Sequence, residues 1–242
     1  MERLKELLLN NKQAKLLEII SVFLVGAIII IIFLKPQSEN LIYNQIVLWV
    51  ANVAMLITVW LGIKLRGEGW ESIGLSFKWP GWKRLLNTFL LSLLVFVLAM
   101  FGFVIGSIIM ANITGIPESA DMSNYAFLKD NLGMLILVLA GVYVVSSFGE
   151  EVIYRGFLIN RFSEFGTDSK TVRIIAVILS AVIFGIVHYS WGPMGIVQTF
   201  FMGLALGLCY IYMKKRLWIM ILAHAYMDTI LMVQMYLASN SG

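Results

Sequence analysis

The sequence predicts an all-α fold, a polytopic membrane helix bundle of about seven transmembrane helices with the N-terminus in the cytoplasm. The first observation is composition: 60% of the 242 residues are hydrophobic and 13% are charged, whereas a soluble domain is about half apolar and a quarter charged. The second is that apolar stretches long enough to cross the hydrocarbon recur along the chain. The third is that Lys and Arg gather in alternate segments between these stretches. Composition therefore excludes a soluble enzyme, a disordered chain and, with Cys209 as the single cysteine, a disulfide scaffold.

Seven stretches qualify as spans, because each approaches the roughly 20 apolar residues that a membrane-crossing helix needs. An eighth span arises only if the third or the seventh stretch is broken. The first stretch lacks a small-residue cleavage site, so we interpret it as a retained anchor rather than a signal peptide. In order, the expected spans are Leu16–Leu34, Leu41–Ile63, Leu85–Ala111, Asn131–Asn160, Ile174–His188, Met194–Met213 and Leu217–Leu237.

The distribution of charge indicates the topology. With the N-terminus inside, 16 of the 18 Lys and Arg residues fall in cytoplasmic segments, and only Lys35 and Lys129 fall outside. The net charge of +4 is thus spread over span ends, which argues against a nucleic-acid partner. Glu18, at the edge of the first span, is expected to face lipid headgroups. We expect a cytoplasmic N-terminal segment, 1–15, followed by one transmembrane domain, 16–238.

Five titratable side chains lie inside the expected spans. Glu150 and Glu151 are on the fourth span, His188 on the fifth, and His224 and Asp228 on the seventh. Ionisable groups at membrane depth are costly, face the protein interior and usually mark a functional site. The two histidines are the only ones in the protein. The sequence therefore predicts a functional site within the bilayer, with the lipid bilayer as its surroundings.

The depths of these residues agree with one site. Counted from the nearest cytoplasmic basic residue at 1.5 Å per residue, Glu150, His188, His224 and Asp228 lie roughly 16, 22, 12 and 18 Å deep. A helix tilt changes each value by several ångström. Three separate helices thus place polar groups near the middle of a hydrocarbon core about 30 Å thick.

Spacing within the helices suggests different roles for the two glutamates. Glu151 and Arg155 are four residues apart and can form an ion pair on one helix face. Glu150 is rotated by about 100° from Glu151 on an α-helix, so the two carboxylates should not do the same work. His224 and Asp228 are also four residues apart, so Asp228 could orient the His224 ring or share a ligand with it.

This set of residues supports hydrolysis by an activated water. Glu150 is the expected general base, and His188 would help to hold or deprotonate the water. His224 and Asp228 would bind the developing oxyanion or position the substrate. In a metal-dependent version, Glu150, His188 and His224 would hold one divalent ion such as Zn²⁺, which polarises the water. The HExxH spacing of many zinc peptidases is absent, and the residues allow both versions.

Three motifs together resemble those of the CPBP intramembrane proteases, the CAAX protease and bacteriocin-processing family also called Abi. The segment Glu150–Arg155 resembles the EExxxR motif, Phe184–His188 the FxxxH motif, and His224–Asp228 the HxxxN or HxxxD motif. The resemblance implies an all-helical membrane peptidase with its motif-bearing core in 132–237 and its site open to the cytoplasm. It also implies peptide-bond hydrolysis, with the first glutamate activating water.

The roles that the resemblance implies fall on particular residues. Glu150 is the base, His188 and His224 assist it, and the last polar role falls on Asp228. Glu151, Arg155 and Phe184 are supporting residues, with Phe184 interpreted as a packing wall.

One residue departs from the pattern of many relatives, including the prenyl-CAAX enzymes. They have Asn where this chain has Asp228. An ionised Asp cannot donate a hydrogen bond to an oxyanion, so Asp228 must be protonated, orient His224 or bind a metal.

The partners that follow are a peptide or membrane-protein substrate and the lipid bilayer, with the oligomeric state left open. The expected location is the plasma membrane of a prokaryote, as an integral protein. The alternatives are a non-catalytic bacteriocin-immunity or scaffold protein with the same fold, and a transporter with a proton relay.

Overall fold

The computed structural model describes residues 2–35, 40–115 and 123–240, and these residues form helices without any strand. The predicted all-α class is therefore confirmed. One segment is a π-helix, η3, and three are short 3₁₀-helices, η1, η2 and η4. The elements are α1 (Glu2–Asn10), α2 (Lys12–Phe33), α3 (Leu41–Leu65), η1 (Trp70–Ile73), α4 (Trp82–Thr114), η2 (Ser123–Leu128), α5 (Leu132–Val142), η3 (Tyr143–Leu158), α6 (Ile159–Ser163), α7 (Lys170–Val187), η4 (Tyr189–Trp191), α8 (Gly192–Tyr212) and α9 (Leu217–Asn240).

Seven helical stretches of the described residues are long and apolar enough to cross a membrane, which confirms the predicted seven spans. The fourth stretch, Leu132–Ser163, joins α5, η3 and α6; we call it the motif helix because it contains Glu150–Arg155. The cytoplasmic location of the N-terminus stays a prediction. The seven stretches are Lys12–Phe33, Leu41–Leu65, Trp82–Thr114, Leu132–Ser163, Lys170–Val187, Tyr189–Tyr212 and Leu217–Leu237.

Contacts divide the chain into two compact units. The first unit comprises 1–69, 120–150 and 225–242, and the second comprises 70–119 and 151–224. The unit boundaries fall inside the motif helix and inside α9. The expectation of one protease domain over 16–238 stays a prediction.

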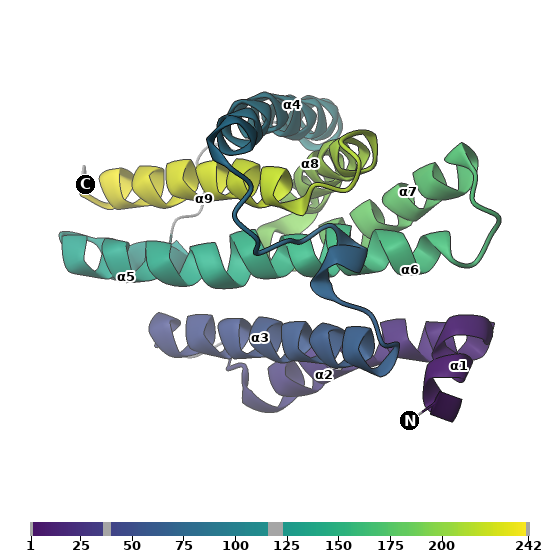
Figure 1. Ribbon diagram of the computed structural model, residues 1–242. Helices are drawn as coiled ribbons and strands as arrows, with labels where there is room; N and C mark the ends of the chain where they lie inside the picture. The colour runs from purple at the N-terminus through teal and green to yellow at the C-terminus, as the bar shows by residue number, and fades with distance from the viewer. Residues whose placement is uncertain (1, 36–39, 116–122, 241–242) are drawn as a thin grey trace. The chain divides into compact units, whose positions relative to one another are not determined.

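In the first unit, α2 and α3 lie side by side (Figure 1). A buried apolar cluster joins the first part of the motif helix to the end of α9, and its members are Leu128, Leu135, Val138, Val142, Met232 and Met235. The cluster surrounds no polar side chain, so it serves to hold these helices together.

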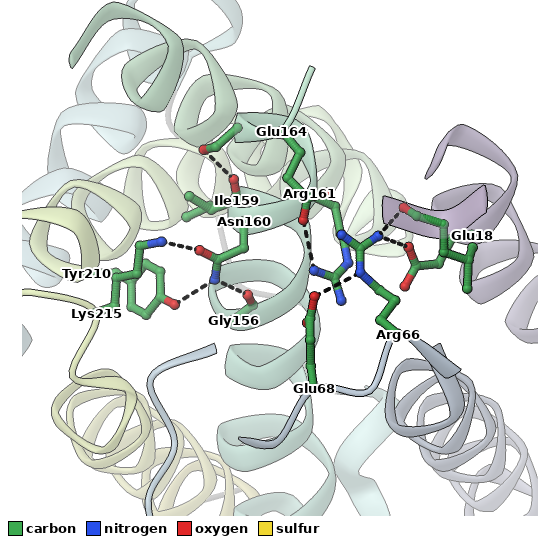
Figure 2. A network of polar contacts seen from close by, with 12 residues as sticks. Glu18, Arg66, Glu68, Gly156, Ile159, Asn160, Arg161, Glu164, Tyr210 and Lys215 are labelled. Carbon is green, nitrogen blue, oxygen red and sulfur yellow. Dashed lines mark hydrogen bonds and ion pairs between the residues drawn. The ribbon is translucent and has the colours of Figure 1, made fainter. Parts of the chain in front are cut away.

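A buried ion pair at the end of α3 corrects the expectation for Glu18. The Arg66 Nη1 atom lies 3.0 Å from Glu18 Oε2 and also donates to the carbonyl oxygen of Leu8 at 2.7 Å. Arg66 Nε donates to Glu68 (Figure 2). Gly62 provides the space, because a Cβ there would lie 2.7 Å from Glu18 Oε1. Glu18 is buried and does not face lipid headgroups, since a buried carboxylate needs a cationic partner.

In the second unit, α8 packs against both α4 and α7 (Figure 1). Glycines allow the close approach: a Cβ on Gly102 would lie 2.6 Å from the carbonyl oxygen of Phe201. Gly203 and Gly207 have the GxxxG spacing that is common where membrane helices pack closely. A Cβ on Gly207 would lie 2.7 Å from Val177.

The segment 70–76, which we call the strap, is tied to the end of α8 and the start of α9. Its carbonyl oxygens accept hydrogen bonds from Tyr210 Oη at 2.9 Å, from the Leu217 amide at 3.1 Å and from Trp218 Nε1 at 2.7 Å. Ile73 and Leu75 are fully buried. These contacts make the strap part of the packed core of this unit.

Gly74 is the residue of the strap for which no substitute fits. Its φ is +80°, and a Cβ there would lie 1.6 Å from the carbonyl oxygen of Lys215. We expect Gly74→Ala to destabilise the protein by at least ~4 kcal/mol, because the clash is with backbone that cannot rotate away. Thermal unfolding of the detergent-purified protein measures this. Gly81→Ala is the matched control, since Gly81 has φ +79° and nothing within 4 Å; it should cost only ~1–2 kcal/mol. Equal losses in the two variants would contradict the assignment.

Candidate active site

The motif helix carries a polar stripe with one residue every fourth position: Tyr143, Ser147, Glu151 and Arg155. All four lie in η3, which is π-helical rather than α-helical. π-Helical turns in α-helices often occur at functional sites. A π-helix has more residues per turn, so Glu150 and Glu151 are separated by less than the 100° that we derived for an α-helix.

Glu151 is the centre of a buried polar group in the second unit. Its Oε1 atom accepts hydrogen bonds from Arg155 Nη1 at 2.7 Å and from His224 Nδ1 at 2.8 Å. Glu151 and Arg155 are 0% and 1% exposed, and His224 is 3% exposed. The predicted ion pair between Glu151 and Arg155 is confirmed. Glu151 thus orients the His224 ring in this unit, and the contact with His224 that Asp228 could make stays a prediction.

Both imidazole rings are held at their Nδ1 atoms. His188 Nδ1 lies 2.7 Å from the carbonyl oxygen of Phe184, and because a carbonyl only accepts, this nitrogen carries the hydrogen. His224 Nδ1 faces the carboxylate of Glu151 in the same way. The bond at Nδ1 sets the orientation of each ring, a pattern typical of functional histidines.

Phe184 forms the wall between these groups, as predicted. It is fully buried, and its ring lies edge-on to His188, with centroids 4.7 Å apart, and to Tyr154, with centroids 4.9 Å apart. The Arg155 guanidinium lies over the Phe184 ring, 4.3 Å from its centroid. Such a contact stabilises a desolvated cation by up to about 2 kcal/mol. Phe184 therefore fixes Arg155 as well as the site wall.

Asp228 and Glu150 belong to the first unit. Asp228 Oδ2 accepts a hydrogen bond from Ser147 Oγ at 2.7 Å, and both Glu150 and Asp228 are partly exposed. The second unit brings together Glu151 and His224 with their neighbours Arg155, Phe184 and His188. The meeting of Glu150 and Asp228 with the two imidazoles stays a prediction.

The side chains of the second unit do not fit a metal ion on their own. Across the described parts of the chain, no three His, Cys, Asp or Glu side chains gather as a ligand set. The one carboxylate near the imidazoles, Glu151, already accepts from Arg155 and His224 through Oε1. The predicted Zn²⁺ set of Glu150, His188 and His224 draws on both units and stays a prediction.

Ser147 is the contact that sequence reasoning missed. It lies outside the three motifs found in the sequence. The signal that could have found it is the stripe, because Ser147 precedes Glu151 by four residues. The residue is fully buried and its hydroxyl is used by Asp228.

Removal of the Ser147 hydroxyl should be measurable. We expect Ser147→Ala to cost ~1.5–3 kcal/mol of stability, the range for a hydrogen bond to a charged group. Thermal or denaturant unfolding in detergent measures it. Ser146→Ala is the control, because the neighbouring serine is less buried and should change stability by less than ~0.5 kcal/mol. Equal effects of the two changes would show that the bond to Asp228 contributes nothing.

Comparison with known proteins agrees with this geometry. Residues 132–230 match the profile of the family described as type II CAAX prenyl endopeptidase Rce1-like. The match includes the motif helix and all the site residues on α7 and α9. No curated protein and no solved structure gave a match.

The matched segment is similar to the CAAX-type intramembrane proteases, which are a peptidase family. With seven apolar helices, the chain is an integral membrane protein.

Proposed function

We propose that this protein is an intramembrane endopeptidase that hydrolyses membrane-associated or small peptide substrates with a water activated by Glu150. The observation that carries the proposal is the difference between the two neighbouring glutamates. Glu151 is fully buried, and its Oε1 atom accepts from both Arg155 and His224. Glu150 is partly exposed, so it is the carboxylate of the pair that can meet a water and a substrate.

In the proposed reaction, Glu150 accepts a proton from water while the water oxygen bonds to the scissile carbonyl carbon. His188, with its hydrogen on Nδ1, accepts a hydrogen bond from this water through Nε2 and orients it. The proton then passes from Glu150 to the amide nitrogen as the carbon–nitrogen bond breaks. The products are a carboxylic acid and an amine, so atoms and charge balance.

The oxyanion that forms in this step needs a hydrogen-bond donor, and His224 is the candidate. Glu151 holds the ring at Nδ1, and in its protonated form the ring donates from Nε2 to the oxyanion. This is the role that a carboxylate plays behind a catalytic imidazole. Removal of a single oxyanion donor commonly lowers kcat by a factor of about 10² to 10³.

Asp228 acts as an acceptor in this proposal. Its Oδ2 atom accepts a hydrogen bond from Ser147. An ionised Asp228 cannot stabilise an oxyanion but can accept from a substrate backbone N–H. The chain therefore positions its substrate with an acceptor where many relatives have the amide of Asn.

The substrate class is tested with the full-length chain in liposomes. The probes are a farnesylated CAAX peptide, the same peptide without the lipid, and an apolar transmembrane peptide, with products identified by mass spectrometry. We expect hydrolysis of at least one probe by the wild type and none by His188→Ala. A site open to the cytoplasm, in the plasma membrane of a prokaryote, is part of the proposal.

Other results would overturn the proposal in recognisable ways. Retained turnover in His188→Ala would remove the assigned role of that ring. Full biological activity of a folded Glu150→Ala variant would indicate the immunity or scaffold function. Proton-coupled flux in vesicles would indicate a transporter. Elemental analysis and chelator sensitivity of the active protein decide whether Zn²⁺ is held by Glu150, His188 and His224.

A further inference from the structure

A strained turn precedes α9 in the second unit. Lys214 and Lys215 have φ values of 57° and 58°, a conformation that residues other than glycine rarely adopt. Each such residue costs on the order of 1–3 kcal/mol and persists only where its surroundings hold it. The Lys215 amide donates to the carbonyl oxygen of Tyr210 at 2.9 Å. Contacts such as the hydrogen bond to Tyr210 therefore hold the turn in this backbone conformation.

The side chain of Lys215 is held by Asn160 of α6. Lys215 Nζ donates to Asn160 Oδ1 at 2.5 Å. Asn160 Nδ2 donates both to the carbonyl oxygen of Gly156 and to Tyr210 Oη, the latter at 2.9 Å (Figure 2). Asn160 is buried, and both ends of its amide are in use. Burial lowers the pKa of Lys215, and the charge of Arg173 acts in the same direction. The position beside Asn160 therefore disfavours the charged form of the Lys215 side chain.

The bond between Asn160 and Lys215 joins the motif helix to the turn just before α9, and the bond between Glu151 and His224 joins the motif helix to α9 itself. On the motif helix, Asn160 follows Glu151 by nine residues. On the other side, His224 follows Lys215 by nine residues. The two chains run in opposite directions, so the two bonds belong to one antiparallel register.

Two further contacts have the same antiparallel order, with the contact of Gly156 and Leu217 offset by two residues from the two bonds. Between the two bonds, a Cβ on Gly156 would lie 3.2 Å from the side chain of Leu217, so the helices are in close contact there. In the first unit, Ser147 and Asp228 lie four residues before Glu151 and four after His224, and they are hydrogen-bonded. Each contact pairs an earlier residue of one helix with a later residue of the other.

We propose that Asn160 and Lys215 are positioning residues, which set the register of α9 against the motif helix so that His224 Nδ1 meets the Glu151 carboxylate. A register error of one residue rotates every side chain of α9 by about 100° and would move the imidazole off the carboxylate. The asparagine–lysine bond lies outside the apolar stretch of α9, nine residues along the chain from His224. The effect of this bond on catalysis rests on the proposed function, whereas its effect on the position of the His224 ring does not.

The test uses the fact that the protein has two histidines. In the full-length protein with ¹⁵N-labelled imidazoles, NMR resolves two rings, and His188→Ala assigns them. The wild type should show a hydrogen-bonded Nδ1 proton on His224. Lys215→Met and Asn160→Ala should lose this resonance and keep that of His188. Lys215→Gln, a milder change with a shorter polar side chain, should shift the His224 resonance in the same direction and serves if the first two variants do not fold.

The matched control is Lys214→Met, because Lys214 is the neighbouring residue, has the same backbone conformation and is exposed. It should leave both rings unchanged. A rescue by Lys215→Arg, which keeps a donor for Asn160, is also expected. An unchanged His224 resonance in folded Lys215→Met or Lys215→Gln, or its loss in Lys214→Met, would overturn the inference. The spectra need no substrate, so a failure of the proposed peptidase activity is seen separately.

Discussion

Glu150→Gln is expected to abolish peptide hydrolysis and to leave the fold intact. Loss of the general base should lower kcat/KM by a factor of about 10² to 10⁴. Glutamine has nearly the same shape as glutamate but cannot accept the proton of the attacking water. The measurement is the rate of probe cleavage in liposomes, together with the unfolding temperature of the same preparation.

The control for this variant is Glu71→Gln, which makes the same chemical change at an exposed position of η1. It should keep the rate of the wild type. A Glu150→Gln protein with a rate within about threefold of the wild type would refute the base assignment. A variant that is inactive because it unfolds would be recognised by its lowered melting temperature and would refute the claim of an intact fold.

Glu151→Gln is expected to have the largest effect on stability among the site residues. Arg155 is 1% exposed, and its partner in the ion pair is the Glu151 carboxylate at 2.7 Å. A buried charge that loses its partner typically destabilises a protein by ~3–5 kcal/mol. Hydrolysis should also decrease, because His224 loses the carboxylate that holds its Nδ1–H. Denaturant unfolding in detergent measures the first effect, and probe cleavage measures the second.

A surface ion pair provides the comparison. Arg173 and Asp168 are 2.6 Å apart with 44% and 82% of their side chains exposed. Asp168→Asn should therefore cost no more than ~1 kcal/mol. A double variant, Glu151→Gln with Arg155→Met, should recover much of the lost stability without recovering hydrolysis, because no buried charge is left. Wild-type stability of Glu151→Gln alone would show that the pair does not hold the site together.

Local spacing was enough to predict part of the site. Glu151 and Arg155 are four residues apart on one helix, so their ion pair depends on few other elements. Phe184 and His188 have the same spacing, and their rings are in contact. Contacts between residues far apart in the chain were not predictable in this way. Glu18 and Arg66 are 48 residues apart, and Glu151 and His224 are 73 residues apart.

The π-helical form of Tyr143–Leu158 could not be predicted from the pattern of polar and apolar residues either. Nearly all residues around it are apolar, so the sequence has little of the polar and apolar alternation from which a helical period can be measured. The sequence does contain the polar stripe with one residue every fourth position. Ser147 in this stripe belongs to none of the three motifs, so the motifs did not indicate it.

By itself, the sequence determined the helical membrane fold, the seven spans and the identity of the titratable side chains, because hydropathy over some twenty residues and the cost of charge in lipid act locally. Only the tertiary structure decided which of these side chains are paired. It directs Glu151 to both Arg155 and His224, Ser147 to Asp228, and Asn160 to Lys215. The reason is that a hydrogen bond requires an approach within about 3 Å, and helix register and packing, rather than composition, determine that approach.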